Sequence, residues 1–158
     1  MTTEKESLKS LSYAHCFNRH FRINDGEYDR LELILKHGIV SPKCAAEHNI
    51  PYENRKLKNF TINIPNYDDF VFLFSIEERR GQHTLGDTIL FYDNSLKVNT
   101  PQELKLPSLS LGEVYARGSI SPKLIRGIQV APNENIENLK QLFLKYVPDL
   151  KKLDIIKV

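Results

Sequence analysis

Residues 110–130 read Ser-Leu-Gly-Glu-Val-Tyr-Ala-Arg-Gly-Ser-Ile-Ser-Pro-Lys-Leu-Ile-Arg-Gly-Ile-Gln-Val, and the fold prediction depends most on this stretch. Alternating apolar residues and turn residues coincide in it, which predicts two short strands joined by a turn. Glu113 stands at the start of the first strand. A carboxylate in that position costs free energy to bury and is usually solvated, paired or catalytic. Glu113 is therefore either an ion-pair partner of Arg117 or Arg126, or a functional residue.

Two segments before this stretch carry the clearest secondary-structure signals. Residues 70–76 form a continuous apolar run between charged residues, which predicts a central strand buried on both faces. Asp25 can cap a helix with apolar residues at helical spacing, and this helix is predicted to end at Gly38 in a left-handed residue. Residues 43–69, which contain several prolines and asparagines, are expected to be mostly surface loop or short helix.

Shorter patterns predict two further strands. Residues 11–17 alternate in the manner of a strand, although a helix is also compatible with their spacing. Residues 88–92 predict a strand that turns back toward residues 96–98 as a hairpin.

The C-terminal part predicts a late helix and a closing strand. Asn133 or Asn135 can cap the helix, Pro148 stops it, and residues 153–158 alternate as a strand would. An early helix, several strands and a late helix indicate an α+β domain rather than regular βαβ units.

Length and composition favour one domain over residues 11–158, preceded by a polar, flexible N-terminus at residues 1–10. The 22 Lys and Arg residues against 20 Asp and Glu give a net charge of +2, which is too balanced to imply nucleic-acid binding by charge alone. The sequence has no secretory leader and no apolar run of membrane-spanning length, so we expect a cytoplasmic protein without a membrane partner. Export as an effector stays open.

Three blocks of sequence, in this order, resemble the ADP-ribosyltransferases, most closely the compact bacterial DNA-modifying toxins of the DarT type. The first is a histidine, followed by Leu-x-x-Ile-Leu-x-x-Gly at residues 31–38. The second is an apolar strand that ends at Ser75 and is followed by Gly86-Asp87. The third is Glu113-Val114 with the glycine, proline and isoleucine pattern of residues 118–130. The resemblance implies an α+β domain of two small packed sheets.

The resemblance also implies a site. In that family NAD lies in a cleft between the sheets, and Glu113 would hold the nicotinamide ribose while the glycosidic bond breaks. A fixed carboxylate stabilises the oxocarbenium-like sugar that forms mainly in the transition state. His15 would contact a ribose hydroxyl, with His20 as the rival histidine at a more usual spacing. Ser75 would help position the glutamate, and Tyr67 would stack on nicotinamide.

The function implied is transfer of ADP-ribose from NAD, as substrate, to a protein or nucleic acid with release of nicotinamide, as in a bacterial toxin or effector. Leu111 lies two residues before Glu113, where relatives that modify arginine have a second acidic residue, so arginine is the less favoured acceptor. Residues 99–109 would lie where the family recognises its acceptor.

Other interpretations stay open beside this one. The same fold could be a non-catalytic nucleic-acid or protein-binding module, because basic residues at 55–58 and 79–80 occur near Tyr52, Phe60 and Tyr67, and stacking aromatics beside cations suit splayed bases. An NAD glycohydrolase, with water as the acceptor, is a third possibility.

Two cysteine-histidine pairs with the same spacing are candidate ligands of a zinc ion. They are Cys16 with His20 and Cys44 with His48. Four such ligands suffice for a tetrahedral site, but this order is unlike that of known structural zinc sites, and we predict no metal.

Overall fold

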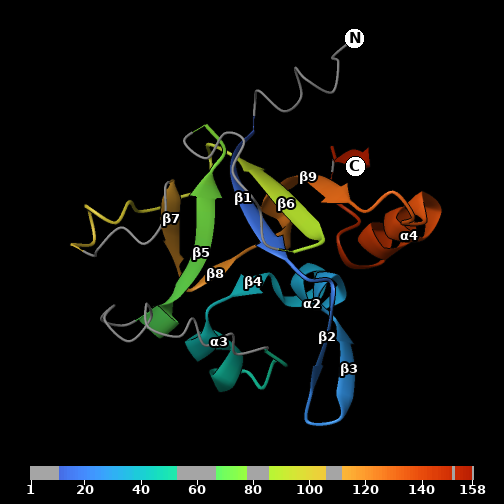
Figure 1. Cartoon of the computed structure of the whole chain (residues 1–158), viewed down its shortest axis with the longest axis horizontal. Helices are drawn as coiled ribbons and strands as arrows, with labels where there is room; N and C mark the ends of the chain where they lie inside the picture. The colour runs from blue at the N-terminus through green and yellow to red at the C-terminus, as the bar shows by residue number, and fades with distance from the viewer. Residues whose placement is uncertain (1–10, 53–66, 78–85, 106–111, 151, 158) are drawn as a thin grey trace.

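A computed structural model describes residues 11–52, 67–77, 86–105, 112–150 and 152–157, without the side chains of Tyr67 and Lys157. The predicted flexible N-terminus at residues 1–10 lies outside these ranges. The described residues form a mixed α/β domain built on a six-stranded sheet, in agreement with the predicted class (Figure 1). No helix in these ranges is long and apolar enough to cross a membrane.

The six strands are ordered β10-β9-β6-β1-β5-β7 across the sheet. All neighbours are antiparallel except β9 and β10, which are parallel. Along the chain the strands are β1 (Leu11–Phe17), β5 (Phe70–Ser75), β6 (Thr88–Asp93), β7 (Glu113–Arg117), β9 (Ile125–Val130) and β10 (Asp154–Lys157).

The sheet forks between β1 and β5. The two strands are paired through Tyr13 with Ser75 and Ala14 with Phe74, and the Ile76 N–H donates to the Ser12 carbonyl at 3.0 Å. In contrast, β1 pairs with β6 from Leu11 to Phe17. In Figure 1, β1 and β5 lie together at their upper ends and diverge below. The structure therefore has one six-stranded sheet in place of the two small packed sheets that the resemblance implies, and β1 and β5 separate beyond Ala14.

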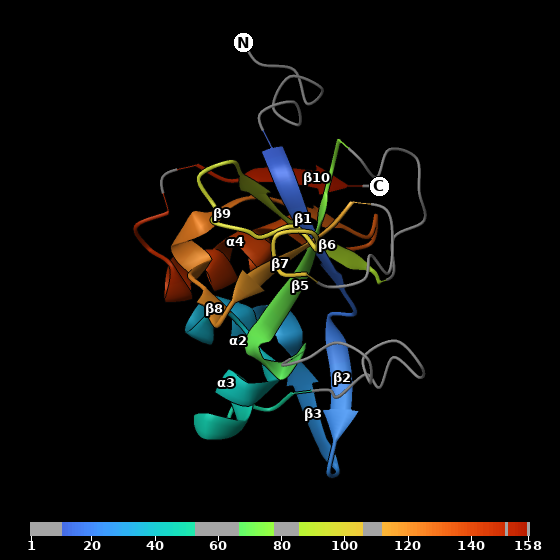
Figure 2. The ribbon, with the colours of Figure 1, turned by 90° about the vertical axis from the view of Figure 1, so that its left-hand side faces the viewer.

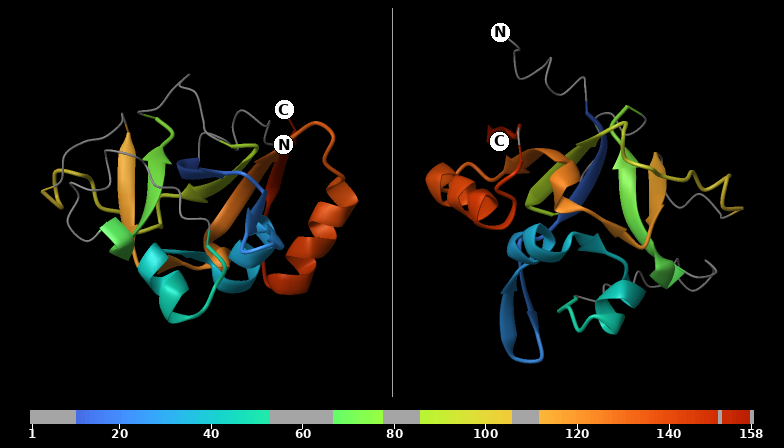
Figure 3. Two further views of the ribbon diagram at one scale, coloured as in Figure 1. Left: turned by 60° about the horizontal axis from the view of Figure 1, so that its bottom comes forward. Right: turned by 180° about the vertical axis from the view of Figure 1, so that it is seen from behind.

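Two helices cover one face of this sheet. They are α2 (Arg30–His37) and α4 (Ile136–Tyr146), and Figure 3 shows α4 beside β9 with α2 below the sheet. Leu31 of α2 and Leu139 of α4 are completely buried in one cluster with Leu90 and Ile128 of the sheet. The amphipathic pattern of each helix therefore produces the main core.

The early helix begins later than predicted. Residues 20–29 instead form a hairpin of β2 (His20–Ile23) and β3 (Gly26–Asp29), which projects from the body of the molecule (Figures 1 and 2). Asn24 and Asp25 have φ angles of 48° and 64°, as a tight two-residue hairpin turn requires. The prediction that Asp25 caps the helix is wrong. Asp29 caps it, accepting the Leu31 N–H at 3.0 Å.

Two strand pairings also differ from the prediction. Residues 96–98 do not continue a hairpin, because the Leu96 N–H donates to the Asp93 carbonyl in a turn and β6 pairs with β1 and β9. The two strands predicted in residues 110–130 form, but β7 pairs with β5 and β9 pairs with β6 and β10. Between them lie β8 (Ser119–Ile120) and a 3-10 helix, η3 (Pro122–Leu124), which carry the chain across the fork.

Other predictions are confirmed. Residues 11–17 form a strand, β5 is a largely buried strand with neighbours on both sides, next to the edge strand β7, and Asn135 caps the late helix by accepting the Asn138 N–H at 3.1 Å. The remaining short elements are β4 (Ile39–Val40), which pairs with β8, then α3 (Pro42–Glu47) and the 3-10 helix η2 (Tyr67–Asp69).

Candidate functional site

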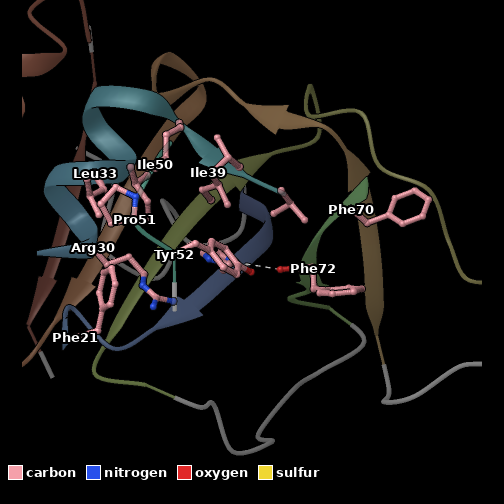
Figure 4. Close-up of a pocket in the computed structure, with 14 residues that line it drawn as sticks. Phe21, Arg30, Leu33, Ile39, Ile50, Pro51, Tyr52, Phe70 and Phe72 are labelled. Carbon is pink, nitrogen blue, oxygen red and sulfur yellow. Dashed lines mark hydrogen bonds between the residues drawn. The ribbon is translucent and has the colours of Figure 1, made fainter. Parts of the chain in front are cut away.

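A pocket lies where the sheet forks, between the diverging parts of β1 and β5 on one side and α2, β4 and residues 50–52 on the other (Figure 4). Its cavity has a volume of about 100 Å³ and is open to solvent on one side. Apolar side chains make most of its wall, and the polar ones come from three residues, His15, Arg30 and Tyr52.

His15 bridges the fork. Its Nδ1 lies 3.0 Å from the carbonyl oxygen of Phe72, a group on β5 beyond the last β1–β5 pair. A carbonyl oxygen only accepts, so Nδ1 is the donor in this hydrogen bond. The ring also stacks on Phe17, with 5.7 Å between ring centroids. These contacts fix the orientation of a side chain that lines the pocket.

The opposite wall is held in place by Gly38. This residue has φ 83° and ψ 177°, a conformation essentially confined to glycine, and its N–H donates to the Ile34 carbonyl at 2.7 Å. A Cβ atom at Gly38 would lie 2.3 Å from the carbonyl oxygen of Ile120. Glycine therefore allows α2 to end against β8 and directs the chain into Ile39, which lines the pocket.

Among the pocket residues, Phe21 and Arg30 were not singled out from the sequence, and Tyr52 was considered only as a stacking aromatic of a nucleic-acid-binding module. Arg30 is the first residue of α2, Phe21 belongs to the β2 strand, and Tyr52 follows α3. The guanidinium carbon of Arg30 lies 4.6 Å from the centroid of the Phe21 ring. Sequence could not assign Phe21 and Arg30, because the hairpin that brings Phe21 beside Arg30 was predicted to be the start of a helix.

Glu113 lies on the opposite face of the sheet from His15. Paired residues project to the same face, and neighbouring residues in a strand project to opposite faces. Because Glu113 pairs with Phe74, and Phe74 pairs with Ala14, these three share one face while His15 is on the other. Figure 4 agrees: Phe70 and Phe72, which share the Glu113 face, point away from the pocket.

The carboxylate of Glu113 has a local partner. The hydroxyl of Tyr115 donates to its Oε2 at 2.8 Å, and Tyr115 itself is fully buried against Phe70 and Phe72. Burial, assisted by the hydrogen bond to Glu113, raises the pKa of the Tyr115 hydroxyl. The alternative partners suggested by the sequence are engaged elsewhere: Arg126 pairs with Asp93 at 3.2 Å, and Arg117 lies over the Phe70 ring.

The other predicted site residues are dispersed. Ser75 lies on the same sheet face as His15, since it pairs with Tyr13, but it is at the joined end of the fork and outside the pocket wall. His20 is exposed in β2 and does not line the pocket. Tyr67 begins η2, and its side chain is outside the described residues. The basic residues at 55–58 and 79–80 also lie outside them.

The cysteine-histidine pairs do not form a common site. Cys16 is in β1 and His20 in β2, whereas Cys44 is in α3 and His48 follows that helix. In the part of the chain that the structure describes, no group of three or more His, Cys, Asp or Glu side chains is arranged to hold a metal ion.

The arrangement at the fork therefore suits a small, partly planar ligand. Its walls are mostly apolar, and the polar side chains of His15, Arg30 and Tyr52 stand among them. Comparisons with protein-family models and with curated proteins return no match for this chain.

Proposed function

We propose that this protein is an NAD-dependent ADP-ribosyltransferase that binds NAD in the pocket at the fork and transfers ADP-ribose to a protein or nucleic acid, releasing nicotinamide. One observation carries the proposal. His15 and the helix of the first sequence block, and the strand of the second block, line one pocket although residues 15, 31–38 and 70–72 are far apart in the sequence.

The chemistry assigns a distinct task to each group. In the transfer, the bond between the ribose C1′ and the nicotinamide nitrogen breaks, and its electron pair leaves with nicotinamide. An acceptor then attacks C1′ and loses its proton. His15 would hydrogen-bond a ribose hydroxyl and so fix the sugar while C1′ becomes positive. The resemblance assigns to Glu113 the stabilisation of that positive charge, but Glu113 lies on the other face of the sheet, so the described residues of the pocket wall supply no carboxylate for this step.

The position of Glu113 favours a second candidate. A ligand on the His15 face of the sheet does not reach a carboxylate on the other face, so the described geometry suits binding better than Glu113-assisted bond breaking. The second candidate is a module that keeps the nucleotide pocket but recognises a nucleic acid or protein without catalysis. An NAD glycohydrolase would share the pocket and release free ADP-ribose.

One experiment separates the three functions. Wild-type protein and Glu113→Gln are incubated with NAD labelled in its adenylate part and with mixed protein or nucleic acid. Labelled macromolecule from the wild type alone supports the transferase with Glu113 as a catalytic residue. Free ADP-ribose without labelled macromolecule identifies the glycohydrolase. Intact NAD throughout, despite measurable NAD binding, identifies the binding module and overturns the enzyme proposal.

A further inference from the structure

We propose that the edge of β5 that faces the fork binds an extended peptide, which adds to the sheet as a parallel strand beside residues 70–72. Phe70, Val71 and Phe72 line the pocket, but the side chains of Phe70 and Phe72 point away from it (Figure 4). These two residues therefore contribute their backbone to the pocket wall. The inference goes beyond the proposed function, because it does not depend on whether the pocket binds NAD.

The hydrogen bonds between β5 and β7 fix the direction of these backbone groups. At one end of this strand pair, the Ser75 N–H donates to the Gly112 carbonyl at 2.7 Å. At the other end, the Gly118 N–H donates to the Asp69 carbonyl at 2.8 Å. Successive residues of a strand direct their backbone groups to opposite sides, so the odd-numbered residues of β5 bond β7. The even-numbered residues, among them Phe72, direct their N–H and C=O toward β1.

Two of the groups directed toward β1 have no hydrogen-bond partner among the described residues, the Phe72 N–H and the Phe70 carbonyl. They lie beyond the last β1–β5 pair, which is Ala14 with Phe74. The Phe72 carbonyl is engaged, because it accepts from the His15 Nδ1 at 3.0 Å. Phe70 is 3% exposed, so its carbonyl has little contact with bulk water, and a buried carbonyl without a partner costs free energy. The two groups therefore favour a ligand that supplies one donor and one acceptor.

One residue of an extended peptide supplies both. In a parallel strand pair, a residue donates its N–H to the carbonyl that precedes its partner and accepts the N–H that follows its partner. The Phe70 carbonyl and the Phe72 N–H occupy these two places on either side of Val71. An antiparallel strand would instead use both the N–H and the C=O of Phe72, and this C=O already accepts from His15. The parallel direction is therefore the one that these groups select.

The walls of the pocket specify the side chain of the bound residue. A residue opposite Val71 projects to the same face as Val71, which packs in the core cluster with residues of α2. The apolar side chains that line the pocket on this side are those of Leu33, Ile34 and Ile39. The pocket is open to solvent on one side, so the flanking residues of a peptide can leave the sheet there. The partner is therefore an extended peptide with an apolar residue at the bound position.

The test combines peptide titration with amide hydrogen exchange measured by NMR, without NAD. The peptides are acetyl-Ser-Leu-Ser-amide, the same peptide N-methylated at leucine, and acetyl-Ser-Asp-Ser-amide. In the free protein, we expect the Phe72 amide to exchange at least about 100-fold faster than those of Val71 and Leu73, which bond β7. The leucine peptide should slow exchange at Phe72 at least about tenfold and leave the other two amides unchanged. The N-methylated peptide cannot donate to Phe70, and it and the aspartate peptide should bind at least about tenfold more weakly.

A matched pair of variants localises the site. Phe72→Leu and Phe72→Pro both lose the aromatic ring, but only proline lacks the N–H. We expect Phe72→Leu to bind the leucine peptide as the wild type does, and Phe72→Pro to bind it at least about tenfold more weakly. Equal affinity of the two folded variants would overturn the inference.

The exchange and titration measurements use the wild-type protein, so they decide the question also where Phe72→Pro does not fold. The inference is overturned if the Phe72 amide of the free protein is as protected as those of Val71 and Leu73. It is likewise overturned if none of the peptides binds, if the leucine peptide binds without slowing exchange at Phe72, or if its N-methylated form binds equally well.

Discussion

The hydroxyl of Tyr92 is fully buried in the core, and in the described part of the chain it has no hydrogen-bond partner. Burial raises the pKa of this hydroxyl, so it stays neutral, but the cost of removing it from water is not recovered. Tyr115 is the contrasting case, because its buried hydroxyl donates to Glu113. The two tyrosines differ mainly in whether this bond is made.

Tyr92→Phe is therefore expected to raise the free energy of unfolding by about 1 kcal/mol, because it removes an unsatisfied polar group without changing the shape of the ring. Tyr115→Phe should lower it by about 1.5 kcal/mol, because it leaves Glu113 without this donor. Urea denaturation of the wild type and both variants measures these changes in the free energy of unfolding. A loss of stability in Tyr92→Phe comparable to that in Tyr115→Phe would show that the Tyr92 hydroxyl is bonded.

Gly38 and Gly118 offer a second matched pair, since both have φ 83°. A Cβ atom at Gly118 meets nothing within 4 Å, while one at Gly38 would collide with the backbone of Ile120. Gly118→Ala should cost about 1 kcal/mol for the left-handed conformation alone. Gly38→Ala should cost at least about 3 kcal/mol, because α2 or β8 must also move. Equal unfolding midpoints for the two variants would contradict the close contact.

At the scale of single residues, the sequence predicted the secondary structure around a residue better than the contacts that the residue makes. The strand pattern correctly put His15 on a strand, and the helix pattern correctly ended α2 at Gly38. It could not show that His15 bonds the Phe72 carbonyl or that Glu113 lies on the opposite face. Both facts depend on the register of β1 and β7 against β5, and no local pattern specifies the register between strands so distant in the chain.

At the scale of the helices and strands, the C-terminal end of β6 is stabilised by the charged side chain of Asp93. The pKa of Asp93 is lowered first by the hydrogen bond from the Ser95 hydroxyl and further by the Ser95 N–H and by Arg126 of β9. A lowered pKa in the folded state means that the carboxylate stabilises the fold above its unfolded pKa of about 3.9. This contribution is lost as the pH falls through the lower folded-state pKa.

Asp93→Asn should therefore be less stable than the wild type at pH 7, by up to about 1 kcal/mol for a partly exposed pair. The difference should narrow below about pH 4, where the wild-type carboxyl also becomes neutral. Denaturation midpoints measured from pH 7 to pH 2.5 test this. Glu137→Gln removes a highly exposed carboxylate of α4 and serves as the control with a smaller effect at pH 7. If the midpoint of Asp93→Asn differed from that of the wild type by the same amount at every pH, the charge of Asp93 would make no contribution to stability.

The observed helices and strands also show which sequence patterns are sufficient to predict an element correctly. Long apolar or amphipathic runs correctly predicted β5 and α4, because burial of such runs leaves few alternatives. The β2–β3 hairpin was missed because its turn, Asn24-Asp25, resembles the start of a helix, and only four residues form each strand. That error hid Phe21, which the hairpin brings to the pocket, and Arg30, which begins α2 beside it.

The whole molecule is organised by the fork between β1 and β5. The ion pairs of Arg19 with Asp29 and Glu134 connect the end of β1, the start of α2 and the segment before α4. The pKa of Arg19 is raised: burial opposes this shift, but the hydrogen bonds from its guanidinium to Asp29 and Glu134 outweigh it. Separation of the sheet, together with this fixed position of α2, leaves the pocket open. Composition and local pattern could not predict a fork, because it arises where distant strands stop pairing.

A calorimetric titration of NAD into wild type, His15→Ala and His20→Ala tests most directly the claim that the fork pocket holds the dinucleotide. The account predicts that the wild type binds NAD, that His15→Ala binds it about tenfold more weakly through loss of one hydrogen bond, and that His20→Ala is unchanged. His20 is the suitable control because it is exposed and outside the pocket wall. No heat of binding to the wild type, or equal affinity of His15→Ala and wild type, would contradict the account.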